Sequence, residues 1–278
     1  MPDFKLHLLN YLKNKKHLRG ERGGEAAEVN PNNKLAPLEG GMGGDLNNLN
    51  TNKIENEILL NLENINKVYP GEQPVHALVD INLTIKRGEF IAIVGPSGSG
   101  KSTLMNILGL LDKVTSGKLY YLGQETSQWN EKQKAIFRNR EIGFIFQAHL
   151  LLPEFTALEN VLMPAYIARR LNHSMEERAK EILTIVGLGD KFYVKPAHLS
   201  GGQNQRVAIA RALMNQPSVV FADEPTGALD QKTGNDIYNL FRKINSEENM
   251  TFIIVTHERG FAQKADRIIE IVDGQIIL

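Results

Sequence analysis

A glycine-rich loop between an apolar strand and a helix constrains the fold more than any other feature of this sequence. Residues 95–103 read GPSGSGKST, which fits the pattern G-x-x-x-x-G-K-[ST]. The apolar stretch FIAIV precedes the loop, and a helical pattern follows it. This strand–loop–helix context is the one that supports such a match. The loop therefore predicts an α/β core of the P-loop type that binds a nucleoside triphosphate.

Each part of the loop has a chemical role in binding phosphate. The glycines let the backbone curl so that its N–H groups face the β- and γ-phosphates. Lys101 adds a positive charge there, Ser102 offers a hydroxyl to Mg²⁺, and the helix dipole favours the anion. The predicted nucleotide-binding residues are Gly95, Pro96, Ser97, Gly98, Ser99, Gly100, Lys101, Ser102 and Thr103.

Two adjacent carboxylates follow a second apolar strand in the stretch VVFADEP. We predict that Asp223 holds Mg²⁺ and that Glu224 orients and deprotonates the attacking water. An acidic pair at a strand end is by itself most often only solvated. The prediction of a hydrolytic centre therefore depends on the P-loop upstream.

A second candidate anion site begins at Ser200. The stretch LSGGQNQRVAIARAL places Ser200, Gly201 and Gly202 ahead of apolar residues at helical spacing. A serine hydroxyl and the free N–H groups of a helix N-terminus favour an anion. The chain thus has two phosphate sites, far apart in the sequence.

The globular pattern begins near Ile58. Stretches 58–70 and 77–95 alternate apolar and polar residues, as half-buried antiparallel strands do. The short apolar runs IGFIF, SVVFAD and TFIIVTH are typical of strands buried in a parallel sheet. The final stretch RIIEIVDGQIIL predicts a hairpin that turns at Asp273–Gly274.

Helices are expected after the P-loop and between the parallel strands. Leu104, Ile107, Leu108 and Leu111 are expected on one helix face. Residues 148–197 contain no comparable strand, so we interpret them as a helical insertion. Within it, SMEERAKEILTIVGLG predicts a helix that ends at glycine, with Ser174 as N-cap and Glu177 completing a capping box.

Residues 1–57 differ in composition from the rest of the chain. Their first part is basic, and an amphipathic helix there would suit an anionic membrane surface, although a solvated tail is the interpretation we favour. Residues 23–57 are rich in Asn and Gly and predict a disordered linker. We therefore divide the chain into a leader, 1–57, and one domain, 58–278.

Composition excludes several classes of protein. The 278 residues include 32 basic and 32 acidic side chains, which predicts no nucleic-acid partner, and there is no cysteine for disulfides or metal ligation. The chain has no apolar run long enough to span a bilayer and no secretory signal. We expect a soluble, intracellular protein that needs a partner for any work at a membrane.

Together, these motifs resemble those of the ATP-binding subunits of ABC transporters, over about residues 58–278. LSGGQ is that family's signature. The resemblance implies the ABC ATPase fold: a P-loop core with an antiparallel β subdomain and an inserted α-helical subdomain. It also implies that Tyr69 stacks on adenine, that Gln147 senses Mg²⁺, that Asp230 belongs to the D-loop and that His257 contacts the γ-phosphate. We interpret the remaining histidines as surface or packing residues; they are His7, His17, His76, His149, His173 and His198.

The resemblance explains why there are two phosphate sites. In this family two subunits pair head to tail around two ATP molecules, and the signature of one caps the γ-phosphate held by the other. The residues implied to act in trans are Ser200, Gly201, Gly202 and Gln203. A homodimer with ATP and Mg²⁺ as cofactors is the expectation, with Mg²⁺ near Ser102, Gln147 and Asp223.

Within the family, LMNILGLLDKVTSGKLYYLGQ and ADEPTGALD look most like the LolD/MacB branch of lipoprotein-releasing and macrolide-efflux ATPases. Such a subunit would drive a separate membrane permease from the cytoplasmic face of the inner membrane, without touching the transported substrate. The alternative is a division- or signalling-type ABC ATPase that acts through a permease-like partner without transport. A kinase or GTPase would not explain LSGGQ or IVTHE.

Overall fold

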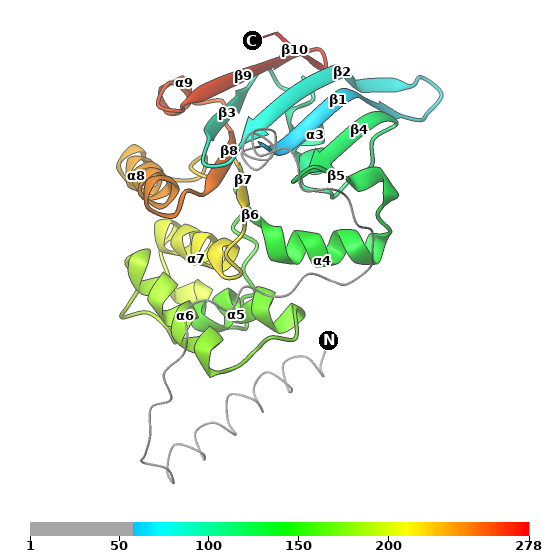
Figure 1. Ribbon diagram of the computed structural model, residues 1–278. Helices are drawn as coiled ribbons and strands as arrows, with labels where there is room; N and C mark the ends of the chain where they lie inside the picture. Colours follow the sequence, from blue (N-terminus) through cyan, green and yellow to red (C-terminus); the bar gives the residue numbers. More distant parts are fainter. Residues whose placement is uncertain (1–57, 278) are drawn as a thin grey trace. The chain divides into compact units, whose positions relative to one another are not determined.

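The strands pair into two sheets of different kinds (Figure 1). The computed structural model describes residues 58–277. Within that range a four-stranded antiparallel sheet has the order β2-β1-β4-β5, and a six-stranded sheet has the order β10-β9-β3-β8-β7-β6. The first sheet comprises β1 (Ile58–Tyr69), β2 (Val75–Lys86), β4 (Ser116–Tyr121) and β5 (Gln124–Glu125). The second comprises β3 (Phe90–Val94), β6 (Ile142–Phe146), β7 (Val219–Asp223), β8 (Thr251–Val255), β9 (Arg267–Val272) and β10 (Gln275–Ile276).

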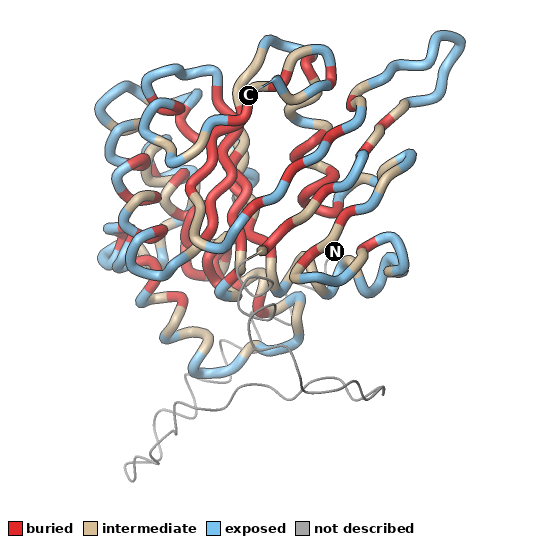
Figure 2. Tube along the Cα trace, turned by 45° about the horizontal axis from the view of Figure 1, so that its top comes forward, coloured by how far each residue is buried: buried red, intermediate tan, exposed pale blue. Residues whose placement is uncertain are grey.

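The second sheet is parallel except at β10, which confirms the prediction made for β6, β7 and β8. For β3 the prediction of an antiparallel strand within 77–95 is wrong, because β3 pairs in parallel with both β8 and β9. Gly88, with φ 75°, ends the antiparallel stretch. The residues of β3 are almost all buried, and the alternation that marks β2 stops there. Figure 2 shows buried strands side by side in the middle of the domain.

The helices are distributed on both sides of the parallel sheet. They are α3 (Lys101–Leu108), α4 (Glu131–Glu141), α5 (Ala157–Ile167), α6 (His173–Ile185), α7 (Gly201–Leu213), α8 (Gln231–Glu248) and α9 (Arg259–Ala262), with 3₁₀ turns at Thr126–Gln128 and Pro196–His198. Residues 148–197 hold α5 and α6 and no strand. No helix within residues 58–277 combines the length and the apolar character that a membrane crossing requires.

Two separate groups of core residues cover the two faces of the parallel sheet. Phe221 of β7 packs in one group with α3 and the antiparallel sheet, and its neighbour Ala222 packs in the other group with α7 and α8. Successive residues of a strand point to opposite faces, so the two helix sets lie on opposite sides. Figure 1 shows α5, α6 and α7 together, apart from β1 and β2.

Two expectations about helix ends are wrong. The N-cap of α6 is Asn172, whose side chain accepts a hydrogen bond from the N–H of Met175 at 3.0 Å, so Ser174 lies inside the helix. Asparagine caps as well as serine does, and the local pattern did not separate them. Helix α3 ends at Leu108, so Leu111 lies beyond it and is 50% exposed.

The predicted hairpin is confirmed, with β9 and β10 antiparallel on either side of Asp273–Gly274. Both turn residues have positive φ, 46° and 77°. The glycine-terminated end of α6 is also confirmed, because Gly187 has φ 79° just after the helix. The predictions for the leader, 1–57, lie outside the described residues.

Candidate nucleotide site

The P-loop joins β3 to α3 and has backbone angles that only glycine adopts without strain. Gly95 and Gly100 have φ values of 150° and 106°. A Cβ on Gly95 would lie 2.1 Å from the carbonyl oxygen of Ile271, and one on Gly100 would lie 2.5 Å from that of Ala77. These glycines therefore provide both the curl of the loop and its close approach to neighbouring strands.

Two polar side chains of the loop, Lys101 and Ser99, differ in their hydrogen-bond partners. The ammonium of Lys101 donates to the carbonyl oxygens of Gly95 and Pro96, at 2.9 and 2.7 Å. Ser99 is 4% exposed, and its hydroxyl has no hydrogen-bond partner within residues 58–277. A buried hydroxyl without a partner is rare in a native structure, and a bound ion or water is one of the partners that would satisfy it.

The C-terminal hairpin supports this loop, which the sequence analysis did not foresee. The N–H of Gly274 donates to the carbonyl oxygen of Ser99 at 3.0 Å, and the N–H of Val79 donates to that of Gly274 at 2.8 Å. The turn thus connects the P-loop to β2. The turn could be predicted from Asp273–Gly274, but no local sequence pattern predicts its hydrogen bond to Ser99 of the P-loop.

The strand register collects the predicted catalytic segments at one edge. Asp223 is opposite Phe146 of β6 and Val255 of β8, and Val255 is opposite Ile93 of β3. Strands β3, β6, β7 and β8 therefore end at the same edge of the sheet. The predicted site segments lie at these strand ends: the P-loop after β3, Gln147 after β6, the acidic pair at the end of β7 and the segment leading to His257 after β8. The carboxyl edge of a parallel sheet is where such folds bind ligands.

The acidic pair has unequal surroundings. Burial and the neighbouring Glu224 raise the pKa of Asp223, and the positive charge of Lys101 partly opposes the shift. Glu224 has a positive φ of 45°. An angle of this kind is costly in a residue other than glycine and is often found at functional sites.

Glu224 also pairs with the predicted histidine. Oε1 of Glu224 lies 2.8 Å from Nδ1 of His257. The hydrogen bond to Glu224 and the negative charge of Glu224 both raise the pKa of His257. Oε2 of Glu224 is buried and has no hydrogen-bond partner in the described part of the chain. His257 also lines a pocket with Gly95 and Pro96, so the histidine lies beside the start of the P-loop.

The segment after β6 connects this edge to α7. Gln147 is exposed, and its Nε2 lies 3.0 Å from where a Cβ of Gly227 would be. His149 hydrogen-bonds through Nδ1 to the fully buried Gln205 of α7, whose Nε2 donates to the carbonyl oxygen of Pro225 at 2.8 Å. The sequence analysis did not predict the contact between His149 and Gln205, because His149 belongs to no motif. The one indication in the sequence was that His149 lies two residues after Gln147.

The signature residues begin α7. Ser200 caps the helix by accepting from the N–H of Gln203 at 3.2 Å, and Ser200 and Gly201 are exposed. A Cβ on Gly202 would lie 2.5 Å from Cγ2 of Thr233, the residue whose N–H donates to Asp230 at 3.0 Å. The signature and the predicted D-loop are thus neighbours. Helix α7 packs in the core group on the side of the sheet opposite α3, so the structure does not bring the signature onto the P-loop of the same chain.

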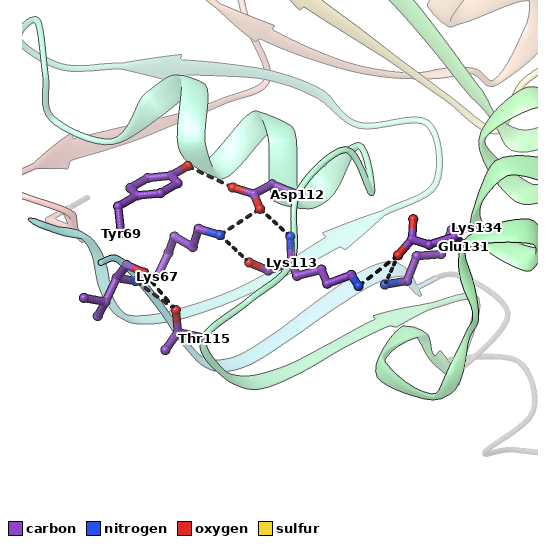
Figure 3. Close-up of polar contacts among 8 residues, drawn as sticks. Lys67, Tyr69, Asp112, Lys113, Thr115, Glu131 and Lys134 are labelled. Carbon is purple, nitrogen blue, oxygen red and sulfur yellow. Dashed lines mark hydrogen bonds and ion pairs between the residues drawn. The ribbon is translucent and has the colours of Figure 1, made fainter. Parts of the chain in front are cut away.

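Tyr69 ends β1 and is 37% exposed. Its hydroxyl donates to Oδ2 of Asp112 at 2.9 Å (Figure 3). Among the described residues, no group of three His, Cys, Asp or Glu side chains is placed to hold a metal ion. That finding is compatible with Mg²⁺, which takes one or two carboxylates together with substrate phosphates.

Comparisons with known proteins agree with this geometry. Residues 78–227 match the family described as ABC transporter. The chain is 49% identical over 221 residues to the lipoprotein-releasing system ATP-binding protein LolD 1 of Chlorobium chlorochromatii (strain CaD3), covering 78% of this chain and 90% of the relative. It is 51% identical over 222 residues to the macrolide export ATP-binding/permease protein MacB of Bartonella henselae, covering 80% of this chain and 34% of that protein.

A solved structure has the same fold. It is the dimeric post-hydrolysis state of an ATP-binding cassette bound to ADP and Pi, with a TM-score of 0.73 and 44% identity, covering 79% of this chain and 97% of that one. The P-loop, the acidic pair and the signature therefore occur in a chain that is similar in sequence to ATP-binding relatives and similar in fold to a solved ATP-binding cassette. The chain belongs to the ABC transporter family, as an ATP-hydrolysing subunit of the LolD/MacB branch.

Proposed function

We propose that Glu224 is the general base of ATP hydrolysis. The observation that carries this proposal is its hydrogen bonding: Oε1 pairs with His257, while the buried Oε2 has no partner within the described residues. Oε2 therefore keeps its capacity to accept a hydrogen bond from the attacking water, which is the geometry a general base needs. His257 holds the carboxylate in place and contacts the γ-phosphate.

The remaining residues of the site bind the nucleotide. Residues 95–103 bind the β- and γ-phosphates through backbone N–H groups and Lys101, and Tyr69 stacks on adenine. Ser102, Gln147 and Asp223 hold Mg²⁺, a set of oxygen donors that suits this hard cation. When bound, Mg²⁺ neutralises charge on the phosphates and fixes their position.

The active unit is a head-to-tail homodimer. Ser200, Gly201, Gly202 and Gln203 of one chain cap the γ-phosphate held by the other, with Asp230 beside them. Two observations support this arrangement: Ser200 and Gly201 are exposed, and α7 packs on the side of the sheet away from α3. The similar cassette that is bound to ADP and Pi is itself dimeric.

The ATPase drives a separate permease of the lipoprotein-releasing or macrolide-export type. It does so from the cytoplasmic face of the inner membrane, and it does not touch the transported substrate. The name of the relative at 49% identity, an ATP-binding protein of a lipoprotein-releasing system, supports a separate permease, while the relative at 51% identity is named as an ATP-binding and permease protein in one chain. Leu150 and Leu152, 57% and 40% exposed, lie just after Gln147 and offer apolar contacts to such a partner.

Crosslinking tests the permease contact. A photo-crosslinking amino acid in place of Leu152 should capture an integral membrane protein in cells. The matched control is the same probe at Ile277, which is 56% exposed on the terminal hairpin. Membrane crosslinks from position 277 and none from position 152 would refute the proposed contact.

A transport assay separates the two candidate roles. The captured permease, reconstituted with this chain in vesicles, should move a lipoprotein or a macrolide when ATP is added and should not do so with the Glu224→Gln chain. ATP turnover that responds to the partner while neither substrate moves would instead support the signalling alternative.

A further inference from the structure

Tyr69 belongs to a network of three side chains that connects the end of β1 to the loop after α3 (Figure 3). One oxygen of Asp112, Oδ2, accepts from the Tyr69 hydroxyl at 2.9 Å, and the other, Oδ1, accepts from the ammonium of Lys67 at 2.7 Å. Burial raises the pKa of Asp112, but hydrogen bonds from Lys67, Tyr69 and the N–H of Lys113 outweigh it and hold the pKa below its usual value. Asp112 therefore holds both partners as a carboxylate.

Lys67 also fixes the plane of the ring. It is 9% exposed, and its ammonium lies 4.7 Å from the centroid of the Tyr69 ring, within the range of a cation–π contact. The ammonium of Lys67 also donates a hydrogen bond to the carbonyl oxygen of Lys113 at 2.8 Å. An ammonium over one side of the ring and a carboxylate at its hydroxyl leave the phenol little rotational freedom.

The network is attached to the helix that begins at the P-loop. Asp112 lies in the loop after α3, whose first residue is Lys101. The hydroxyl of Thr115, in the same loop, accepts from the N–H of Val68 at 2.9 Å, and the N–H of Thr115 donates to the carbonyl oxygen of Asn66 at 2.8 Å. The end of β1 that carries Tyr69 is thereby connected to α3.

We propose that Asp112 and Lys67 are positioning residues that hold the Tyr69 ring in place for the nucleotide base. The inference rests on the proposed stacking of Tyr69 on adenine and extends it to two residues that act through the Tyr69 ring. Through α3, the network keeps the surface that binds the base in register with the loop that binds the phosphates. A ring fixed before binding loses less entropy when the base stacks on it.

The test separates base binding from phosphate binding. Affinities of the full-length chain for ATP and for inorganic tripolyphosphate, both with Mg²⁺, are measured by titration calorimetry. Asp112→Asn should weaken ATP binding about fivefold, because the shared carboxylate is lost, and should leave tripolyphosphate affinity unchanged. Tyr69→Phe should act in the same direction, and adding Asp112→Asn to Tyr69→Phe should cost less than Asp112→Asn alone, because only the bond from Lys67 to the carboxylate is left to lose.

A matched control comes from a neighbouring ion pair. Glu131 pairs with Lys113 at 3.1 Å, with both side chains largely exposed, and neither side chain contacts Tyr69 (Figure 3). Glu131→Gln should keep ATP affinity within about twofold, because exposed ion pairs contribute little. The melting temperature of each variant shows that it is folded.

Three results would overturn the inference: equal losses of ATP and tripolyphosphate affinity in Asp112→Asn, no loss of either, or a full further loss when Tyr69 is already Phe. The failure of the proposed function looks different. If the unchanged chain binds neither compound, or if Tyr69→Ala leaves ATP affinity intact, then the assignment of Tyr69 itself is wrong.

Discussion

At the scale of single residues, the two oxygens of Glu224 have different surroundings. His257 occupies Oε1, and Oε2 is buried without a partner among residues 58–277. Glutamine keeps the size of the side chain and one oxygen but removes the basic carboxylate. Glu224→Gln should therefore keep ATP binding and lose steady-state hydrolysis by about 100-fold or more. Phosphate release and nucleotide affinity are measured on the same preparation.

A change at the P-loop gives the contrasting result. Lys101→Ala should weaken nucleotide binding itself, because the ammonium inside the loop is lost. If Glu224→Gln turned over ATP at a near-normal rate, Glu224 would not be the base.

At the scale of elements, the β9–β10 turn does more than connect two strands. Gly274 has φ 77°, and a Cβ there would lie 2.9 Å from the carbonyl oxygen of Ala77 and 3.2 Å from Cα of Leu78. Gly274→Ala should therefore displace the turn that hydrogen-bonds to Ser99 of the P-loop. We expect a lower melting temperature and weaker ATP binding.

The β4–β5 turn provides a matched control. Gly123 has almost the same φ, 75°, but a Cβ there would meet nothing within 4 Å. Gly123→Ala should cost about 1 kcal/mol of folding free energy from the backbone angle alone, and Gly274→Ala should cost about 1–2 kcal/mol more. Thermal and denaturant unfolding compare the two. Equal losses would mean that the contact with β2 contributes nothing.

At the scale of the whole molecule, the P-loop helix and the signature helix belong to different core groups on opposite faces of one sheet. This separation argues for sites shared between chains. Neither Lys101→Ala nor Ser200→Arg alone should form a competent site. Mixed, the Ser200→Arg chain supplies Lys101 and the Lys101→Ala chain supplies Ser200, so one intact site can form in a heterodimer.

The measurement is ATP-dependent closure, read by a crosslink across the dimer contact, because turnover can require both sites. Half-site closure in the mixture, and in neither variant alone, is the expected result. A chain that carries both substitutions, mixed with either single variant, is the control and should not rescue closure. If the mixture behaves as the average of its parts at every concentration, the homodimer with shared sites is wrong.

The sequence by itself determined the features that short stretches encode. The P-loop, the parallel strands β6, β7 and β8 and the hairpin turn could all be predicted, because short apolar runs and the backbone demands on glycine are local properties. The same local reasoning misjudged the N-cap of α6, where Asn172 and Ser174 compete, and the direction of β3, which its neighbours set.

Tertiary structure alone decided which distant residues meet. Tyr69 and Asp112 are 43 residues apart, and His149 and Gln205 are 56 apart, yet each pair hydrogen-bonds. Gly274 reaches the P-loop in the same way, from the far end of the chain. No periodicity or spacing predicts such contacts, because they arise when separate elements pack on a common sheet and leave polar groups facing one another. The motifs could therefore be identified from the sequence, but the residues that support them could be identified only from the tertiary structure.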